Sequence, residues 1–173
     1  MDLQPAKELA TLYRELQPGL LRYLRAVAPG AAEDLAADVW VEVTAGAHRF
    51  QGDRSAFRSW LYTIARRRVI DAHRRAGRRR TDPVSTERLV VVPAPDLPEE
   101  LALDLMATET AIARVVAVLS PDQAQVVLLR VVGGLRVAQV AELLGKQPGT
   151  VRVLQHRGLR RLAGYWPPES MPA

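Results

Sequence analysis

The stretch FQGDRSAFRSWLYTIARRRVIDAHRRAGRRR, from Phe50 to Arg80, determines how this chain is organised. It opens on a Gly-Asp turn and continues with apolar residues at positions i, i+3, i+4 and i+7, a spacing that predicts a helix with one buried side. These residues are Phe57, Trp60, Leu61 and Ile64. From Arg66 onward the stretch holds eight arginines and one acid. Aromatic rings followed by cations favour a nucleic-acid partner; an ordinary core helix with a solvated basic tail is the alternative.

The composition indicates an all-α protein. The chain has 173 residues, of which 48% are hydrophobic, so it can bury a core as one domain or as two small ones. Ala, Leu, Val and Arg dominate, aromatic residues are few, and the polar-apolar alternation of strands is scarce.

The charge of the chain points to a polyanionic partner. The net charge is +5 and the sequence pI about 10.2. A second basic region, residues 131–161, holds six Lys or Arg residues and one acid, Glu142. Residues 81–108 between the two basic regions are net acidic.

Several classes of site and location are excluded or disfavoured. The chain has no cysteine, which excludes disulfides, thiol redox sensing and Cys-ligated zinc. His48, His73 and His156 are isolated in the sequence, so we expect no metal site and no cofactor. A signal peptide and a long apolar run are lacking, which predicts a soluble cytoplasmic protein.

The first thirty residues predict a helical hairpin. Apolar residues recur at helical spacing in 9–16 and again in 20–27. A Pro-Gly pair at residue 18 separates the two runs, and another at residue 29 follows the second.

Two further helices are expected in the N-terminal half. Residues 31–45 form the third helix, with Glu33 and Asp34 in its first turn, where carboxylates favour the helix dipole. The fourth helix is capped by Asp53 or Ser55 and runs to about residue 76.

Residues 81–104 read as a flexible, Pro-rich acidic linker between two domains, 1–80 and 105–164, with a tail over 165–173. Shielding of the basic faces by the acids of this linker is the alternative to a plain solvated tether.

The second domain carries the pattern of a helix-turn-helix. Ser120 and Pro121 are typical of a helix start, and the helix they open is expected to run to about residue 132. An apolar helix over 137–144, a turn at Gly145, and a helix capped by Thr150 follow. The residues then left facing outward are Arg152, Val153, Gln155, His156 and Arg157. An ordinary helical hairpin is the alternative.

Three segments together resemble the extracytoplasmic-function (ECF) sigma factors of the sigma-70 family, from about Leu12 to Leu162. AEDLAADVW (32–40) is similar to region 2.2 of that family, and FQGDRSAFRSWLYTIARRRVIDAHRR (50–75) to regions 2.3 and 2.4. LSPDQAQVVLLRVVGGLRVAQVAELLGKQPGTVRVLQHRGLRRL (119–162) is similar to region 4.

The resemblance implies a transcription initiation factor, not an enzyme, with no metal site. Its implied partners are promoter DNA, core RNA polymerase through the largest-subunit clamp helices and the flap, and an anti-sigma protein. The implied minus-10 residues are Phe50, Gly52, Asp53, Arg54, Ser55, Phe57, Trp60, Arg66, Arg67, Arg68, Arg74 and Arg75. The implied minus-35 residues are Lys146, Thr150, Arg152, Gln155, His156, Arg157 and Arg160. The implied polymerase-binding residues are Asp34, Asp38, Trp40 and Val41.

The sequence departs from the family in the last helix, where many members have Ser-Arg-Leu in place of Val153-Leu154-Gln155. Whether Leu154 or Gln155 faces DNA is therefore open. A stand-alone helix-turn-helix repressor or activator is the alternative function, although it has no use for the aromatic loop. A recombinase or nuclease would need a nucleophile, for which Ser55 between Arg54 and Arg58 is the candidate.

Overall fold

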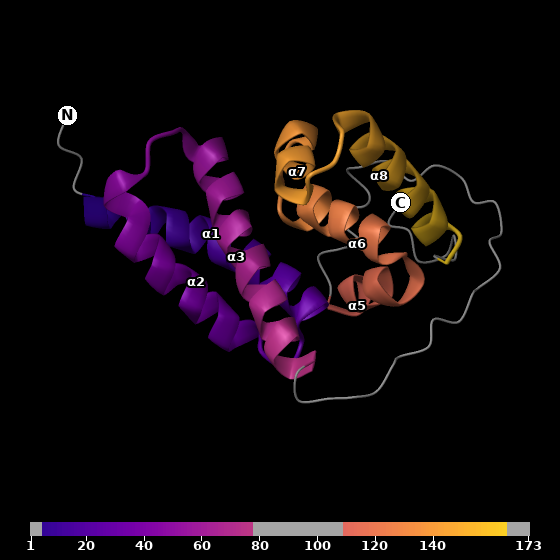
Figure 1. Cartoon of the computed structure of the whole chain (residues 1–173), viewed down its shortest axis with the longest axis horizontal. Helices are drawn as coiled ribbons and strands as arrows, with labels where there is room; N and C mark the ends of the chain where they lie inside the picture. Colours follow the sequence, from indigo (N-terminus) through magenta and orange to yellow (C-terminus); the bar gives the residue numbers. More distant parts are fainter. Residues whose placement is uncertain (1–4, 78–108, 166–173) are drawn as a thin grey trace, which may run out of the picture. The chain divides into compact units, whose positions relative to one another are not determined.

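The structure, a computed structural model, describes residues 5–77 and 109–165. Every regular element in these two ranges is helical, which confirms the all-α prediction (Figure 1). The chain divides into two compact units, Met1–Ala76 and Gly77–Ala173. The predicted linker and all but Tyr165 of the predicted tail lie outside the described residues. None of the described helices combines the length and the apolar character that crossing a membrane requires.

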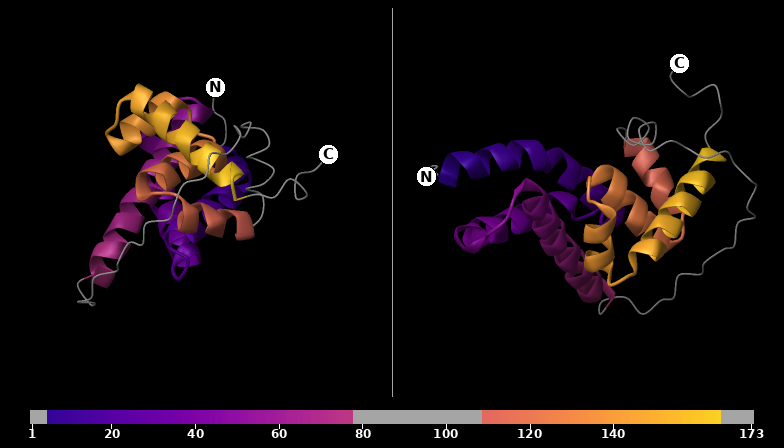
Figure 2. Two further views of the ribbon diagram at one scale, coloured as in Figure 1. Left: turned by 90° about the vertical axis from the view of Figure 1, so that its right-hand side faces the viewer. Right: turned by 90° about the horizontal axis from the view of Figure 1, so that it is seen from above.

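The first unit consists of α1 (Pro5–Val27), α2 (Ala32–Gly46), the short 3-10 helix η1 (Ala47–Arg49) and α3 (Arg54–Gly77). Helices α1 and α2 pack against each other (Figures 1 and 2). Helix α3 joins them through large side chains: the rings of Tyr23 and Tyr62 meet edge to face with centroids 5.4 Å apart. Both tyrosines are fully buried, and together with the buried side chains of α2 they form the core of this unit.

The predicted break at Pro18 is wrong, because α1 continues through this residue. Leu16 and Leu20 are buried on either side of the proline, four residues apart, and so keep one apolar stripe in phase. Pro18 itself is exposed. We infer that the packing of this stripe outweighs the hydrogen bond that proline removes from the helix. The predicted end of the segment is confirmed, since α1 stops at Val27.

The start of α3 is fixed by Asp53 and not by Ser55. The Asp53 carboxylate accepts a hydrogen bond of 2.8 Å from the backbone N–H of Ala56, while its own carbonyl accepts the N–H of Phe57. This is the geometry of a helix N-cap. The cap sets the direction in which α3 leaves the loop of residues 50–53.

The second unit consists of α5 (Glu109–Val118), α6 (Pro121–Val127), a π-helical turn η2 (Leu128–Val132), α7 (Val137–Leu144) and α8 (Pro148–Ala163). The predicted start of α6 is confirmed: Ser120 is the N-cap and forms a capping box with Gln123. The bounds of α7 are those predicted from the sequence.

The turn of the helix-turn-helix depends on Gly145, which has φ +63° at the C-terminus of α7. A side chain is disfavoured in this left-handed conformation. The prediction that Thr150 caps the next helix is wrong, because α8 begins at Pro148 after Gln147. Proline suits the first helical position, since its φ is already helical and its missing N–H has no partner there.

Helix α8 packs along α6 and α7 (Figure 2). Gly158 allows the close approach to α6: a Cβ at this position would lie 2.9 Å from Cγ2 of Val127. Val127 and Leu128 are fully buried beneath the contact. This core holds α8 with its opposite side turned to solvent.

Candidate nucleic-acid interfaces and docking surface

Three aromatic rings form a cluster at the loop that precedes α3. Phe50 stacks on Trp60 with ring centroids 5.2 Å apart, and Phe57 meets both rings nearly edge-on at 5.3 and 5.5 Å. Phe57 is buried, whereas Phe50 and Trp60 are half-buried. Gly52 completes the cluster, because a Cβ there would lie 2.9 Å from Cζ of Phe50. The loop is therefore a packed structure that the aromatic side chains hold in place.

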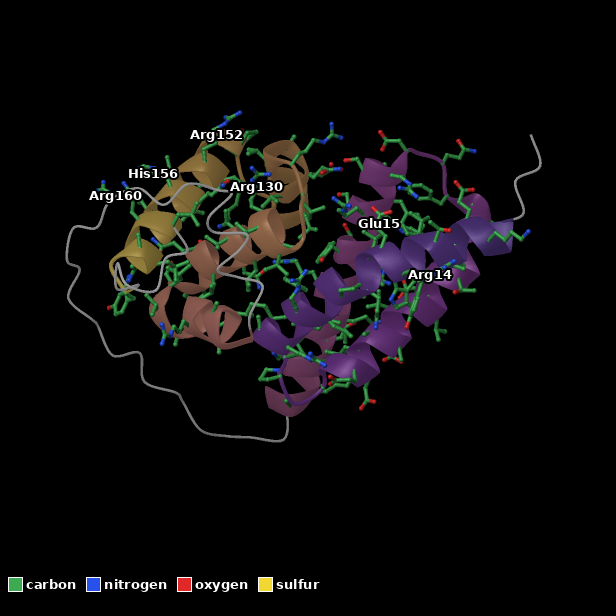
Figure 3. All side chains as sticks on the ribbon, turned by 180° about the vertical axis from the view of Figure 1, so that it is seen from behind. Arg14, Glu15, Arg130, Arg152, His156 and Arg160 are labelled. Carbon is green, nitrogen blue, oxygen red and sulfur yellow. The ribbon has the colours of Figure 1, made fainter. Side chains whose placement is uncertain are left out.

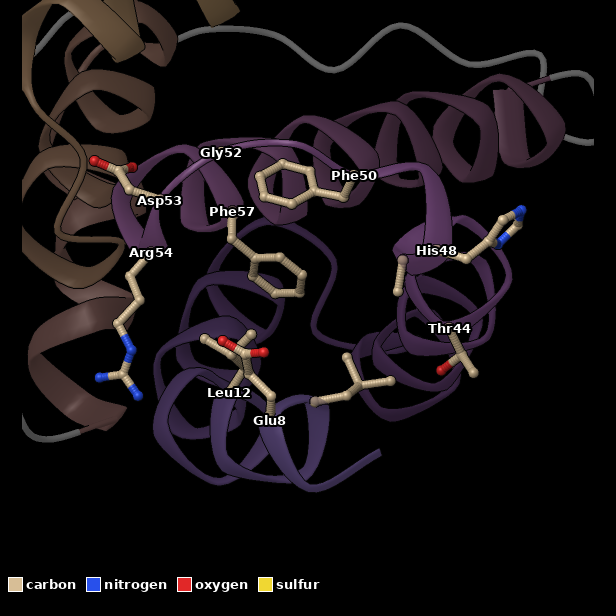
Figure 4. A pocket seen from close by; sticks show the side chains of 11 residues that line it. Glu8, Leu12, Thr44, His48, Phe50, Gly52, Asp53, Arg54 and Phe57 are labelled. Atoms are coloured by element: carbon tan, nitrogen blue, oxygen red, sulfur yellow. The ribbon is translucent and has the colours of Figure 1, made fainter. Parts of the chain in front are cut away.

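The loop forms one wall of a pocket of about 450 Å³, and the first turns of α1 form another. Figure 4 shows the rings of Phe50 and Phe57 opposite Leu12 and Glu8 of α1. The pocket thus combines an apolar interior with polar groups around it. The polar lining residues are Glu8, Thr44, His48, Asp53 and Arg54.

The sequence did not reveal the contribution of α1 to this pocket. In the sequence, Leu9 and Leu12 are two of the apolar positions of the first predicted helix, and some forty positions separate them from the loop. Glu15, one turn further along α1, also reaches the loop helix: its carboxylate lies 3.0 Å from Arg54 Nη1 and 3.2 Å from Arg58 Nη2. No local signal marks contacts at this sequence separation.

The predicted arginines of α3 differ in their surroundings. Arg67 and Arg68 both bond to the carboxylate of Glu42 on α2, with Arg68 Nη2 2.8 Å from Oε2. The hydrogen bond from Arg67, followed by that from Arg68, lowers the pKa of Glu42, against the opposing effect of its burial. Arg74 and Arg75 lie exposed in the last turn.

Arg66 is set toward the core. Its side chain is half-buried, and its Nε is buried without a hydrogen-bond partner in the described part of the chain. Burial raises the pKa of Tyr23 to about 12, and the nearby positive charge of Arg66 acts in the opposite direction. Five arginines of α3 beyond its first turn were predicted to contact minus-10 DNA. Arg66 is the one of these whose side chain reaches furthest into the core.

A second surface lies on α2. Asp34, Asp38 and Val41 follow one another at i, i+4 and i+7 and are all exposed, with 71% of Val41 accessible. Trp40 is only 8% exposed. Its indole N–H donates a 2.6 Å hydrogen bond to Gln17 Oε1 on α1.

An apolar groove adjoins this acidic row. The ring of Tyr13 lies 4.9 Å from the ring of Trp40, between centroids. Tyr13 and Val41 are exposed along the groove, so Trp40 helps to build it from below instead of projecting from the surface. The lining residues are Leu9, Ala10, Tyr13, Ala37, Trp40, Val41 and Thr44.

The third surface is the outer side of α8. Figure 3 shows Arg152, His156 and Arg160 projecting from this helix, and their i, i+4, i+8 spacing places them on one face. Thr150 and Arg157 are also exposed. This face is cationic over most of the length of the helix.

Two predicted minus-35 residues are tied to neighbouring elements. Gln155 is half-buried and its Oε1 accepts a 2.9 Å hydrogen bond from Nε of Arg130, which also donates to the carbonyl of Leu135 (Figure 3 labels Arg130). Lys146 Nζ lies 2.9 Å from the Asp122 carboxylate. Leu154 and Gln155 are both half-buried, so Val153 is the exposed member of the unusual triplet.

The described residues contain no group of three or more His, Asp or Glu side chains that could hold a metal ion.

Known proteins resemble the chain over both units. The family model of sigma-70 region 2 matches residues 12–79, and that of sigma-70 region 4 matches residues 109–162. The ECF RNA polymerase sigma factor SigD of Mycobacterium tuberculosis is 33% identical over 162 residues, which cover 89% of this chain and 74% of SigD. The ECF RNA polymerase sigma factor ShbA of Streptomyces griseus is 35% identical, with 87% of this chain and 83% of ShbA covered.

Among solved structures, the sigma factor RpoE in complex with the anti-sigma factor NepR, from Bartonella quintana, has the same fold. Its TM-score is 0.62 at 23% identity, and the match covers 90% of this chain and 94% of the other.

Proposed function

This chain belongs to the sigma-70 family as an ECF-type initiation factor that directs RNA polymerase to promoters, and we propose how its residues divide that work. The pocket between the aromatic loop and α1 carries the proposal. It is assigned to a single base flipped out of the minus-10 element. Unstacking a base costs a few kcal/mol, which stacking and hydrogen bonds inside a fitted pocket can offset.

Two features of the pocket support this role. Its volume of about 450 Å³ is large enough to admit a base, and the aromatic rings of Phe50 and Phe57 are part of its lining. His48, Asp53 and Arg54 line it with donors and acceptors for the Watson–Crick edge of a base. Gly52, Ser55 and Trp60 then act by shaping and supporting the loop.

The arginines of α3 are assigned to the phosphates of the melted strand. Arg74 and Arg75, exposed in the last turn, make the first contacts. Arg67 and Arg68 must exchange the Glu42 carboxylate for phosphate, and breaking these ion pairs reduces the net gain from their phosphate contacts. Arg66, whose side chain points toward the core, supports the position of α3. Such contacts are salt-dependent and carry little sequence information.

The outer face of α8 is assigned to the major groove of the minus-35 element. Arg152, Gln155, His156 and Arg157 make base contacts, and Lys146, Thr150 and Arg160 contact the backbone. A good bidentate pair discriminates between bases by about 1–3 kcal/mol.

The acidic row and groove of α2 are assigned to core RNA polymerase. Asp34 and Asp38 supply charge, Val41 supplies apolar area, and Trp40 keeps the groove in shape through its bond to Gln17. We assign this surface to the clamp helices of the largest subunit and the second unit to the flap. An anti-sigma protein that covers the same surfaces would hold the factor inactive, and the factor would act in the cytoplasm, where its polymerase is.

The test is transcription by core polymerase reconstituted with this chain on a pool of random promoter sequences. We expect start sites that share a minus-10 and a minus-35 element. Phe50→Ala should abolish open-complex formation while the minus-35 preference persists. Tight, specific binding of a duplex without polymerase, together with no specific starts, would instead identify a stand-alone regulator and refute the proposal.

A further inference from the structure

Val153 is an apolar side chain on a face that is otherwise polar and cationic. It lies on α8 with 47% of its surface exposed. Its neighbours on this side of the helix are Arg152, His156 and Arg157, all exposed (Figure 3 shows Arg152 and His156). The core of the second unit is made without it.

The exposed position of Val153 costs stability in the free protein. A β-branched residue is a weaker helix former than the polar residues usual at such sites, because its χ1 is restricted in a helix. Burial in a core normally offsets this cost, and Val153 has no such burial. A single exposed valine is common on protein surfaces, so its place on α8 decides its meaning.

That place is the sixth residue of a helix that begins at Pro148. The N-terminal half of a recognition helix is the part that meets base edges in the major groove. His156 and Arg157, three and four residues after Val153, are its neighbours on the helix surface and are both exposed. A base edge that these two side chains approach therefore also lies within reach of Val153.

The major groove presents one apolar group, the C5-methyl of thymine. The other atoms that a base edge displays there are donors or acceptors, which a valine would strip of water without replacing a hydrogen bond. We propose that Val153 is a specificity-determining residue that selects a thymine in the minus-35 element by contact with its C5-methyl. This proposal rests on the assignment of α8 to that element.

The removal of one methyl group from the DNA tests the contact. Holoenzyme first selects promoters from a pool randomised across the minus-35 element. Each thymine of the selected element, on either strand, is then replaced by deoxyuridine, which leaves base pairing unchanged. The affinity of each duplex is measured for holoenzyme that contains the wild-type chain, Val153→Ser or Val116→Ser.

Val116→Ser is the matched control, because Val116 is 44% exposed on α5, outside the helix-turn-helix. We expect deoxyuridine at one position to weaken wild-type binding about fourfold, the value for one buried methyl-sized group. Val153→Ser should show no penalty at that position, and Val116→Ser should behave as the wild type.

Two results would overturn this proposal and leave the assignment of α8 to promoter DNA intact. In the first, deoxyuridine weakens the binding of the wild type and of Val153→Ser equally at every thymine of the element, or the selected element contains no thymine. In the second, Arg152→Ala destroys selection of the minus-35 element but every deoxyuridine is neutral for the wild type. If no minus-35 element is selected at all, the assignment of α8 to promoter DNA fails and the proposal falls with it.

Discussion

Two glycines of α8 stand in opposite surroundings, so the same substitution should have opposite effects at the two sites. A Cβ at Gly158 would lie 2.9 Å from the buried side chain of Val127, whereas a Cβ at Gly149 would meet nothing within 4 Å. Gly158→Ala should destabilise the second unit by about 1–3 kcal/mol through overpacking. Gly149→Ala should stabilise it by up to about 1 kcal/mol, because alanine is the better helix former.

Hydrogen exchange of the α6 and α8 amides measures both effects. Gly149→Ala should also be assayed for promoter binding, since the glycine lies in the first turn of the helix that we assign to DNA. If the absence of a side chain there serves close approach to the backbone of DNA, promoter binding should weaken while stability rises. A stabilised variant with unchanged binding would mean that Gly149 has no part in the interface.

The charge state of Glu42 is linked to the stability of the first unit. Its pKa is lowered by the hydrogen bonds from Arg67 and Arg68. Because the folded-state pKa lies below that of the unfolded chain, the stabilisation is present above the unfolded value, about 4.3 for Glu, and is lost as the pH falls through the folded value. Glu42→Gln should therefore lower stability near pH 7 and make it less dependent on pH below about 5.

Urea unfolding at a series of pH values checks this, with Glu33→Gln as the control. Glu33 also bonds to an arginine, Arg25, but its side chain is 65% exposed, so its pair should contribute less. In DNA binding, Glu42→Gln should strengthen the non-specific, salt-sensitive component, because Arg67 and Arg68 lose their internal partner. Equal pH profiles for wild type and Glu42→Gln would contradict the linkage.

At the scale of elements, α1 contains a proline that its packing tolerates. Pro18 removes a backbone hydrogen bond from the interior of the helix and crowds the preceding turn. Pro18→Ala should therefore stabilise the first unit, by about 1–3 kcal/mol. Tryptophan fluorescence in urea, with Trp166→Phe as background, reports Trp40 and Trp60 of this unit. An unchanged or lower midpoint would mean that the proline gives α1 a shape that its core contacts need.

The elements were predictable where the signal is local. The start of α6 at Ser120 and the bounds of α7 follow from capping residues and apolar spacing, both readable within a few positions. The continuity of α1 was not predictable, because it depends on the packing of buried side chains, which outweighs the hydrogen bond lost at Pro18. The partners of Arg67 and Arg68 lie on α2, some 25 residues away, and the pocket joins α1 to a loop far along the chain. Such contacts have no local signature.

Helix α2 gives a functional prediction at the same scale. Asp38→Arg places a cation in the acidic row next to Val41, on a side chain exposed to solvent, so the fold should be unaffected. An acidic row fits a partner surface that carries cations, and the new arginine would face those cations with the same charge. We therefore expect much less core polymerase to co-purify with this variant. Thr63→Arg, at an exposed site on α3, is the control and should co-purify normally. Equal recovery with Asp38→Arg would remove Asp38 from the docking surface.

At the scale of the whole molecule, each unit has a core of its own. Leu61 is fully buried in the first unit and Leu128 in the second. An initiation factor has two DNA elements to engage, and two units with separate cores would allow each proposed DNA surface to meet its own element. The connection raises the effective concentration of the second surface once the first is bound. Stability should then be a local property of each unit.

Leu61→Ala and Leu128→Ala form the matched pair that tests this. Each removes a buried leucine and should destabilise its own unit by about 2.7–5 kcal/mol. Hydrogen exchange resolved along the sequence should show protection falling within residues 5–77 for the first variant and within 109–165 for the second. Because energies of distant, independent sites add, the double variant should show the sum of both patterns. Protection lost in the unmutated unit would mean that the two cores fold as one cooperative body, and that the surfaces they carry are coupled through the protein.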